Sequence, residues 1–525
     1  MPDFTRLRNS NYLYLTGLIL LVAGMPVSLF LTSLSQFFLA GSFFLEGDLR
    51  GKVKRFFSNK PMMLIAGIWL LHIIGMVWTA DFQEGIKDIR IKLPLLVLSV
   101  IIGGSSLLTV KEFKLIAAVF IFSVFAGTIS AMAVLTGIIH REIYDIRDIF
   151  IYHISHIRFA LFTSIAVYLL AWFAFFQKPL SLLLKILAIA LAVWFVIFLA
   201  ITQSVTGLVV LIAATIVTLF FLLLKVKNRV AKVVILIALF AFPAIVGYSI
   251  FEEVRLFYTI KNIPINKNDK TSAGNEYQFY DNISYENGYP VNVYIQDDEL
   301  RTTWNKRSLL PYDSLDRRGQ YMKSTILRYL TSKGLRKDGE AVAGLSQEEV
   351  VAIENGVSNF RFRELSGLRP RIYQIIWETD NMLKGQNPNG HSVTQRAEFW
   401  KAAFGIFKEH PFFGVGTGDL VQSYKEEYVK QNSRLDENHR LRAHNQYLSI
   451  AAGFGLFGFV YFLFALLYPL SDYKKLSPLF LLFLLTLLIS MLSEDTLETQ
   501  PGATFAAFFF AIFLNTEFKI QNSEF

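Results

Sequence analysis

The stretch Arg442-Ala-His-Asn-Gln-Tyr-Leu-Ser-Ile-Ala-Ala-Gly-Phe-Gly-Leu-Phe-Gly458 is the point at which a long polar segment turns back into an apolar one. The preceding residues, 251–442, are rich in charged and polar side chains, whereas apolar runs follow. Runs of about 18 to 25 apolar residues are typical of membrane-spanning helices. The stretch therefore predicts a folded polar segment that re-enters a membrane here.

The composition indicates a membrane protein. Of the 525 residues, 53% are hydrophobic, and the mean hydropathy is +0.42, which excludes a soluble globular chain. The net charge of +9 would suit nucleic acid, but the lysines and arginines gather in short loops between apolar runs, where they set membrane orientation. We therefore expect contacts with membrane lipids and no nucleic-acid partner. The absence of cysteine excludes disulfides and thiolate metal sites.

The apolar runs predict an all-α polytopic membrane protein with about twelve transmembrane helices. We expect nine spans in residues 1–250, a polar domain in residues 251–442 and three further spans in residues 443–525. Within the polar domain, residues 267–298 predict turns with short strands, and residues 320–333 and 346–358 predict helices. The spans are expected near residues 11–26, 28–46, 61–79, 92–108, 113–138, 158–176, 181–201, 206–224, 232–250, 443–470, 477–493 and 501–517.

Positive charge in the short loops orients these spans. Lysine and arginine are enriched in cytoplasmic loops, and here they concentrate in residues 50–55, 225–232 and 474–475. This distribution predicts that both termini are cytoplasmic. The span count then places the polar domain outside the cytoplasm.

A helix is expected at the end of the polar domain. The sequence Ser392-Val-Thr-Gln395 fits a capping box, in which serine accepts from a backbone N–H and glutamine reaches back. The helix would run to about Glu409 and stop before Pro411. The alternative interpretation is a helix that lies on the membrane surface with Arg396 reaching to the headgroups. One helical face would carry Arg396, Trp400, Ala403 and Phe407.

Polar residues gather at the outer ends of the predicted spans, whereas ionisable groups are nearly absent from the apolar runs. His72 is the clearest exception, and a lone histidine is more often a packing residue than a ligand. Transporters coupled to ions usually place carboxylates at mid-membrane, so this pattern disfavours that class and predicts a site at the outer membrane surface. The outer polar residues are Lys92, His153, His156, Arg158, residues 202–204, His444 and residues 494–500.

Arg158 and His444 carry most of the predicted chemistry. Arg158 opens the sixth span, where a fixed cation needs a carboxylate or a ligand phosphate as its partner. Arg440 and Arg442 could add to the same positive field or form a solvated rim; several arginines would suit a diphosphate. His444 is expected in the first turn of the tenth span, where the helix dipole favours a neutral imidazole, as a general base requires. The alternative is a histidine that only sits at the interface.

Glycines are expected to bring segments close together near this histidine. Tyr447 would lie beside His444, and Gly455 and Gly458 would let a neighbouring helix approach. The sequence Gly414-Val-Gly-Thr-Gly418 is weak as a phosphate loop, because it follows no buried strand; it favours a tight turn instead. No His, Asp and Glu residues have metal-ligand spacing, so we predict no metal site and no cofactor.

Together these motifs resemble the O-antigen ligase family, whose relatives include O-antigen polymerases and protein O-oligosaccharyltransferases. The His-Asn-(nine)-Gly-(two)-Gly spacing matches in full, although Phe459 departs from the small or polar residue often found next. The resemblance is specific over residues 390–460, and Trp78-Thr-Ala-Asp81 and residues 494–500 are also similar. The motif carriers are Arg396-Ala-Glu-Phe-Trp400, His410-Pro-Phe-Phe-Gly-Val-Gly-Thr-Gly418, His444, Asn445, Gly455 and Gly458.

The resemblance implies a GT-C-like fold with a large periplasmic loop domain in a bacterial inner membrane. It implies metal-independent transfer of a glycan from an undecaprenyl-diphosphate donor to an acceptor such as lipid A-core, at the periplasmic face. His444 would be the base, and Arg158 and Arg396 would hold the diphosphate. The substrate-binding candidates are Arg442, Asn445, Tyr447, Trp400, Lys92 and Glu494.

Two alternatives stay open. An O-antigen or exopolysaccharide polymerase would handle the donor in the same way and differ only in the acceptor. A lipid-linked oligosaccharide flippase would belong to another class, and it would need a charged central cavity.

Overall fold

The computed structural model describes residues 4–143, 146–151, 154–176, 180–281, 284–364 and 368–518. His153, which the sequence places among the outer polar residues, lies outside the described residues. The chain divides into two compact units. Unit 1 comprises residues 1–141, 149–232 and 381–525, and unit 2 comprises residues 142–148 and 233–380.

Every predicted apolar run coincides with a helix. These runs are long stretches of Leu, Ile, Phe and Ala. A segment surrounded by lipid must form its backbone hydrogen bonds internally, so each stretch is helical along its length. The helices are α1 (Phe4–Gly24), α2 (Leu29–Leu45), α4 (Lys60–Gly75), α5 (Phe82–Gly104), α6 (Val110–Leu135), α7 (His156–Phe176), α8 (Leu182–Ile201), α9 (Val205–Lys225), α10 (Arg229–Tyr258), α19 (Gln446–Leu467), α20 (Pro478–Ser490) and α21 (Gln500–Leu514).

Fewer of these helices meet the length and hydropathy of a full span. Among the described residues, seven do so, or eight if α2 and the helix α3 (Leu49–Ser58), bent by 115°, form one span. Three further apolar helices are shorter. Helix α5 falls short because its first half is charged, with Asp88 and Lys92 among its residues. An all-α polytopic membrane protein is thus confirmed, while the number twelve stays a prediction.

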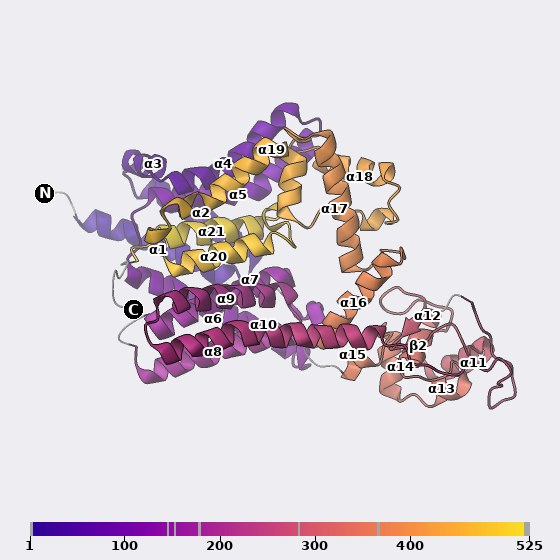
Figure 1. Cartoon of the computed structure of the whole chain (residues 1–525). Coiled ribbons are helices and arrows are strands. Elements are labelled where there is room, and N and C mark those ends of the chain that lie inside the picture. Colours follow the sequence, from indigo (N-terminus) through magenta and orange to yellow (C-terminus); the bar gives the residue numbers. More distant parts are fainter. Residues whose placement is uncertain are drawn as a thin grey trace. The chain divides into compact units, whose positions relative to one another are not determined.

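In unit 1, the C-terminal helices pack among the N-terminal ones. Helix α5 contacts both α4 and α21, and α19 contacts α4, so segments about 400 residues apart lie side by side (Figure 1). The α21 interface alternates alanines with phenylalanines. Ala503 and Ala507 are fully buried and permit close approach, while Phe509 stacks edge-on against Phe120 of α6.

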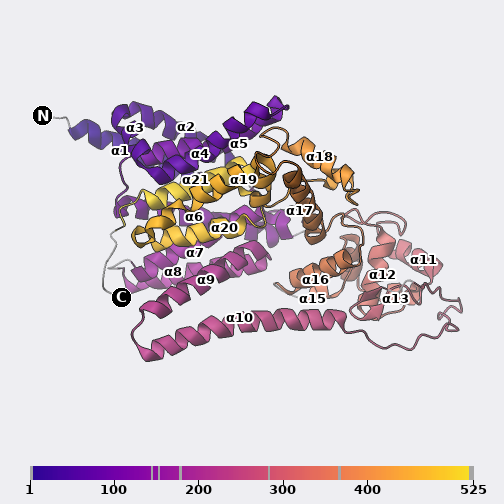
Figure 2. The same ribbon diagram turned by 45° about the horizontal axis from the view of Figure 1, so that its top comes forward.

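Helix α17 (Ser392–Glu409) and helix α18 (Leu420–Lys430) complete unit 1, and α17 runs at a steep angle to the bundle helices in both views (Figures 1 and 2). The predicted end of α17 at Glu409 is confirmed. The predicted capping box is wrong, because the N-cap residue is His391 and no side chain caps the helix.

The predicted face of α17 also needs correction. The side chains that pack inward are Phe399, Ala402, Ala403 and Ile406. Trp400 is instead 41% exposed. The inward face is therefore offset by one residue from the predicted stripe and is not headed by Arg396.

A glycine-rich loop, residues 410–418, packs against a break in α19. The break lies at Gly455, which has φ +63°. Across it, the N–H of Val415 donates to the carbonyl of Ala452 at 3.1 Å, and the N–H of Leu456 donates to that of Pro411 at 2.7 Å. A Cβ on Gly455 would lie 2.2 Å from a backbone carbon of Phe412. The tight turn is confirmed, but Gly455 accommodates this loop rather than a neighbouring helix.

Unit 2 has its own core. The fully buried side chains of Trp304, Tyr312 and Tyr329 lie at its centre. The antiparallel hairpin of β1 (Tyr285–Glu286) and β2 (Tyr289–Pro290) turns at Asn287-Gly288, both at positive φ, as a two-residue hairpin favours. The helices are α11 (Asp297–Arg307), α12 (Met322–Ser332), α13 (Gly339–Ala343), α14 (Gln347–Glu354), α15 (Arg361–Glu364) and α16 (Arg369–Leu383), so both predicted helices in this region are confirmed.

Candidate functional site

His444 immediately precedes the N-cap of α19. The helix begins at Gln446 with Asn445 as its cap, three residues later than the sequence predicts. The backbone of His444 has φ +46°, a left-handed conformation that costs a non-glycine residue roughly 1–2 kcal/mol. Its N–H donates to Asp495 Oδ2 at 2.9 Å, and the N–H of Asn445 donates to Asp495 Oδ1 at 3.0 Å. Both hydrogen bonds are made with the chain in this conformation.

Helix α17 borders the imidazole. The ring centroids of His444 and Phe399 are 5.6 Å apart. One residue further along α17, Trp400 Nε1 donates to the carbonyl of Ala443 at 3.0 Å. An indole N–H and an aromatic ring therefore fix α17 against the start of α19 and place Arg396, one turn earlier, at the same site.

Glu494 links the predicted site residues. Its Oε1 lies 4.0 Å from Arg396 Nη2, and the charges of His444, Arg396 and Arg158 all act on its carboxylate. Arg158, in the first turn of α7, donates through Nη2 to Thr499 Oγ1 at 2.5 Å. The structure thus brings together three residues that are far apart in the sequence, around the segment 494–499.

The electrostatics of this cluster favour a neutral histidine. Burial lowers the pKa of His444 below its ordinary value of 6.5, Glu494 opposes that shift, and Arg396 reinforces it. Burial raises the pKa of Glu494 above its ordinary value, while the neighbouring His444 and Arg396 act to lower it. A neutral imidazole can accept a proton, which is what a general base must do.

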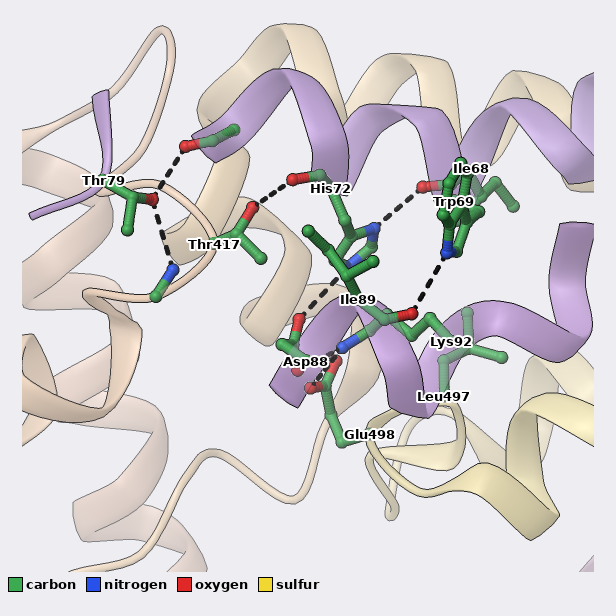
Figure 3. Close-up of polar contacts among 12 residues, drawn as sticks. Ile68, Trp69, His72, Thr79, Asp88, Ile89, Lys92, Thr417, Leu497 and Glu498 are labelled. Atoms are coloured by element: carbon green, nitrogen blue, oxygen red, sulfur yellow. Dashed lines mark hydrogen bonds and ion pairs between the residues drawn. The ribbon is translucent and has the colours of Figure 1, made fainter. Parts of the chain in front are cut away.

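A second group of charges includes Asp88, Lys92 and Glu498, which Figure 3 shows side by side. Lys92 is fully buried, and its Nζ lies 2.6 Å from Asp88 Oδ1 and 2.8 Å from Glu498 Oε2. Arg442 Nη1 lies 2.5 Å from the same Glu498 oxygen. Burial alone would raise the pKa of Glu498, but Lys92 and Arg442 hold this pKa well below its ordinary value. We call Asp88, Lys92, Arg442 and Glu498 the inner network.

His72 joins this network rather than standing alone. Its Nδ1 is 2.8 Å from the carbonyl of Ile68, and its Nε2 is 3.8 Å from Asp88 Oδ2 (Figure 3). Its own carbonyl accepts from Thr417 Oγ1 of the glycine-rich loop at 2.6 Å. These contacts are consistent with the packing residue that the sequence suggests, with a carboxylate neighbour that the sequence does not reveal.

Most of the predicted substrate-binding side chains have partners within the protein. Asn445 caps α19 by accepting from Leu448, at 3.1 Å. The hydroxyl of Tyr447 donates to the carbonyl of Leu488 at 2.8 Å, and Lys92 is enclosed by two carboxylates. Of the six candidates, Glu494 lies 4.0 Å from Arg396, and its carboxylate also senses the charges of His444 and Arg158.

Sequence reasoning missed three carboxylates. Asp495 and Glu498 belong to a polar segment that the sequence singles out, but their partners lie about 50 and 400 residues away. Asp88 could have been found, because it stands four residues before Lys92 on one helix face, where opposite charges pair. Within the described part of the chain, no three His, Asp or Glu side chains are grouped so as to hold a metal ion, and metal independence stays a prediction.

Comparison with known proteins identifies one matching family model. Residues 347–463 match the model described as O-antigen ligase. The matched segment includes Arg396 and His444 but neither Arg158 nor Glu494. The match confirms the resemblance to this family and supports a membrane glycan transferase of the ligase or polymerase type. No curated protein matches the chain.

Proposed function

We propose that this protein is a glycan transferase of O-antigen ligase type. It moves an oligo- or polysaccharide from an undecaprenyl-diphosphate donor to a hydroxyl of lipid A-core. The observation that carries the proposal is that Arg396 and His444, from the matched segment, and Arg158, from outside it, all contact residues of the segment 494–499. Two arginines beside one neutral histidine suit an acidic leaving group and a hydroxyl nucleophile.

In this proposal His444 is the general base. The imidazole removes the proton of the acceptor hydroxyl while the hydroxyl oxygen bonds to the anomeric carbon of the donor. The bond from that carbon to the diphosphate oxygen breaks, and the bonding electrons leave with undecaprenyl diphosphate. Glu494 then stabilises the imidazolium, because the two groups already influence each other's protonation.

Arg158 and Arg396 neutralise the leaving group. A guanidinium donates two parallel N–H groups to phosphate oxygens, which a lysine cannot do. Arg396 makes a long contact of 4.0 Å with Glu494, and Arg158 donates to a neutral hydroxyl. Both arginines can therefore turn to a diphosphate without breaking a close ion pair.

The proposal includes a location and a set of partners. The protein is a multi-pass protein of the bacterial inner membrane with both termini in the cytoplasm and its site at the periplasmic face. A lipid-linked donor reaches such a site from the bilayer, and the leaving diphosphate supplies the driving force. The reaction then needs no metal ion, ATP or other cofactor.

The decisive experiment is a deletion strain whose lipopolysaccharide is separated on a gel. Ligase activity predicts core without O-chain, together with accumulated long lipid-linked polymer. Core that carries a single repeat unit would identify a polymerase instead. The purified protein in detergent, given both donor and core, should form the joined product; a flippase would form none.

A further inference from the structure

We propose that Asp495 is the positioning residue of His444; this inference rests on the proposed function of His444 as the base. Its oxygens accept from the main-chain N–H groups of His444 and Asn445. It acts on the main chain that carries the imidazole, and its role is to keep that main chain in the left-handed conformation.

Three donors converge on the Asp495 carboxylate. Oδ2 accepts the N–H of His444 at 2.9 Å, and Oδ1 accepts the N–H of Asn445 at 3.0 Å. Oδ1 also accepts the hydroxyl of Ser449 at 2.7 Å. Two successive N–H groups can reach one carboxylate because the chain bends at φ +46° between them. Releasing the carboxylate would remove what favours that bend over an ordinary extended conformation.

The support of Asp495 is itself fixed. It is buried, and on both sides of it the chain is tied to the first turn of α19. Upstream, the side-chain amide of Asn445 donates to the carbonyl of Leu492 at 3.1 Å. Downstream, Leu497 N–H donates to Gln446 Oε1 at 2.7 Å. The carboxylate is therefore presented to His444 by a rigid frame.

The neighbouring residue Glu494 has a different task. Its carboxylate lies towards Arg396, whereas that of Asp495 receives main-chain donors. Two adjacent acids thus serve the two halves of the site. Glu494 interacts with the charges of the site residues, and Asp495 sets the position of the base.

The first test is Asp495→Asn in the full-length protein. An asparagine has one acceptor oxygen, so at least one of the two main-chain N–H groups loses its partner. We expect kcat to fall by about 10- to 100-fold while the KM for the lipid-linked donor stays within about threefold. In the His444→Ala background, the same substitution should cause no further loss of transfer.

Asp419→Asn is the matched control. Asp419 also accepts two successive main-chain N–H groups, those of Ala80 and Asp81, at 2.8 and 2.7 Å. It therefore loses hydrogen bonds of the same kind on another, more exposed segment. It should lower thermal stability less than Asp495→Asn does and leave kcat close to that of the wild type.

A second readout needs no substrate. Carbethoxylation of His444 is followed by mass spectrometry as a function of pH. When the hydrogen bonds from Asp495 are lost, the imidazole should become more accessible. His444 in Asp495→Asn should therefore be modified several-fold faster, and the midpoint of the pH dependence of its modification should move up towards 6.5. Asp419→Asn should leave both the rate and the midpoint unchanged.

The outcomes separate the two proposals. Unchanged His444 reactivity in Asp495→Asn, with activity lost only as much as in Asp419→Asn, would overturn the positioning role. If the wild-type protein forms no glycan product, the proposed function fails, but the modification experiment still decides whether Asp495 positions His444.

Discussion

At the scale of single residues, the availability of each cation depends on the acids that already hold it. Lys92 lies between two carboxylates at 2.6 and 2.8 Å, so its charge is neutralised inside the protein. Arg396 has its carboxylate neighbour at 4.0 Å, and Arg158 donates to a hydroxyl. Burial and pairing thus divide the predicted cations into Lys92 and Arg442, which belong to the inner network, and Arg158 and Arg396, which lie outside it.

His444→Ala should abolish glycan transfer without unfolding the protein. Removing a general base typically costs about 10²- to 10⁴-fold in rate. Product formation by the purified variant measures the effect, and its melting temperature shows that it is folded. His410→Ala is the control, since this exposed histidine has no role in the proposal. Full activity of His444→Ala would eliminate the histidine as the base.

Arg158→Lys should lower transfer by about 10²-fold although the charge is kept. The loss arises because an ammonium cannot donate two parallel hydrogen bonds to a diphosphate. Donor binding and turnover by the purified variant provide the measurement. Arg141→Lys, at an exposed position of the neighbouring loop, should leave donor binding and turnover unchanged. Turnover near that of the wild type would point to a membrane anchor instead.

The acid limb of the pH–rate profile should lie below pH 6.5. In the proposed mechanism the active form of His444 is neutral. Burial lowers the pKa of His444 from the ordinary value of 6.5, so the neutral form persists as pH falls to that lower value. Arg396 lowers this pKa and Glu494 raises it.

Substitutions at these two neighbours should therefore move the limb in opposite directions. Arg396→Gln should shift the residual activity to higher pH, and Glu494→Gln should shift it to lower pH. Profiles of kcat against pH for the three proteins test this order. A shift of both variants in the same direction would contradict the proposed coupling.

At the scale of elements, the helices could be predicted and their contacts could not. Each apolar run predicts its helix because length and hydropathy are local properties. The pairing of α5 with α21 is not local, and without it the contact between Lys92 and Glu498 cannot be inferred. The inward face of α17 differs from the predicted face by one residue because Trp400, although apolar, lies at the surface, where its indole N–H donates to the carbonyl of Ala443.

Gly455→Ala should destabilise the protein by several kcal/mol, because it combines positive φ with a Cβ 2.2 Å from the backbone of Phe412. Gly453→Ala, two residues earlier, is the matched control. There the nearest atom to a new Cβ is 3.9 Å away, and alanine favours a helix by about 1 kcal/mol over glycine. Thermal unfolding in detergent compares the two. Equal melting temperatures would show that the glycine-rich loop shifts to accommodate the new Cβ at little cost in stability.

At the scale of the whole molecule, two units share one chain, and each has its own interior. Unit 2 is built around Trp304, Tyr312 and Tyr329, whereas unit 1 carries the candidate site and the packed apolar helices. The site residues all belong to unit 1, although residues 381–442 were expected to be part of the separate polar domain. The sequence signals polarity there, but it does not signal which neighbours the segment packs against.

The predicted orientation can be tested directly because the chain lacks cysteine. Asn266→Cys, at an exposed position of unit 2, should react with an impermeant maleimide in intact spheroplasts. Lys474→Cys and Lys227→Cys, both exposed, should react only after the membrane is permeabilised. The reverse pattern would place the candidate site on the cytoplasmic side.

The interruption of α19 at Gly455 also resets the angular phase of this helix. Successive side chains advance by about 100° only within a continuous helix, so the residues on either side of the break follow separate progressions. A deletion or insertion on the C-terminal side of Gly455 would rotate the C-terminal half of α19. It would leave the N-terminal half, which begins beside His444, in register. The half of α19 that begins beside the candidate site therefore keeps its register when the sequence changes in the rest of the span.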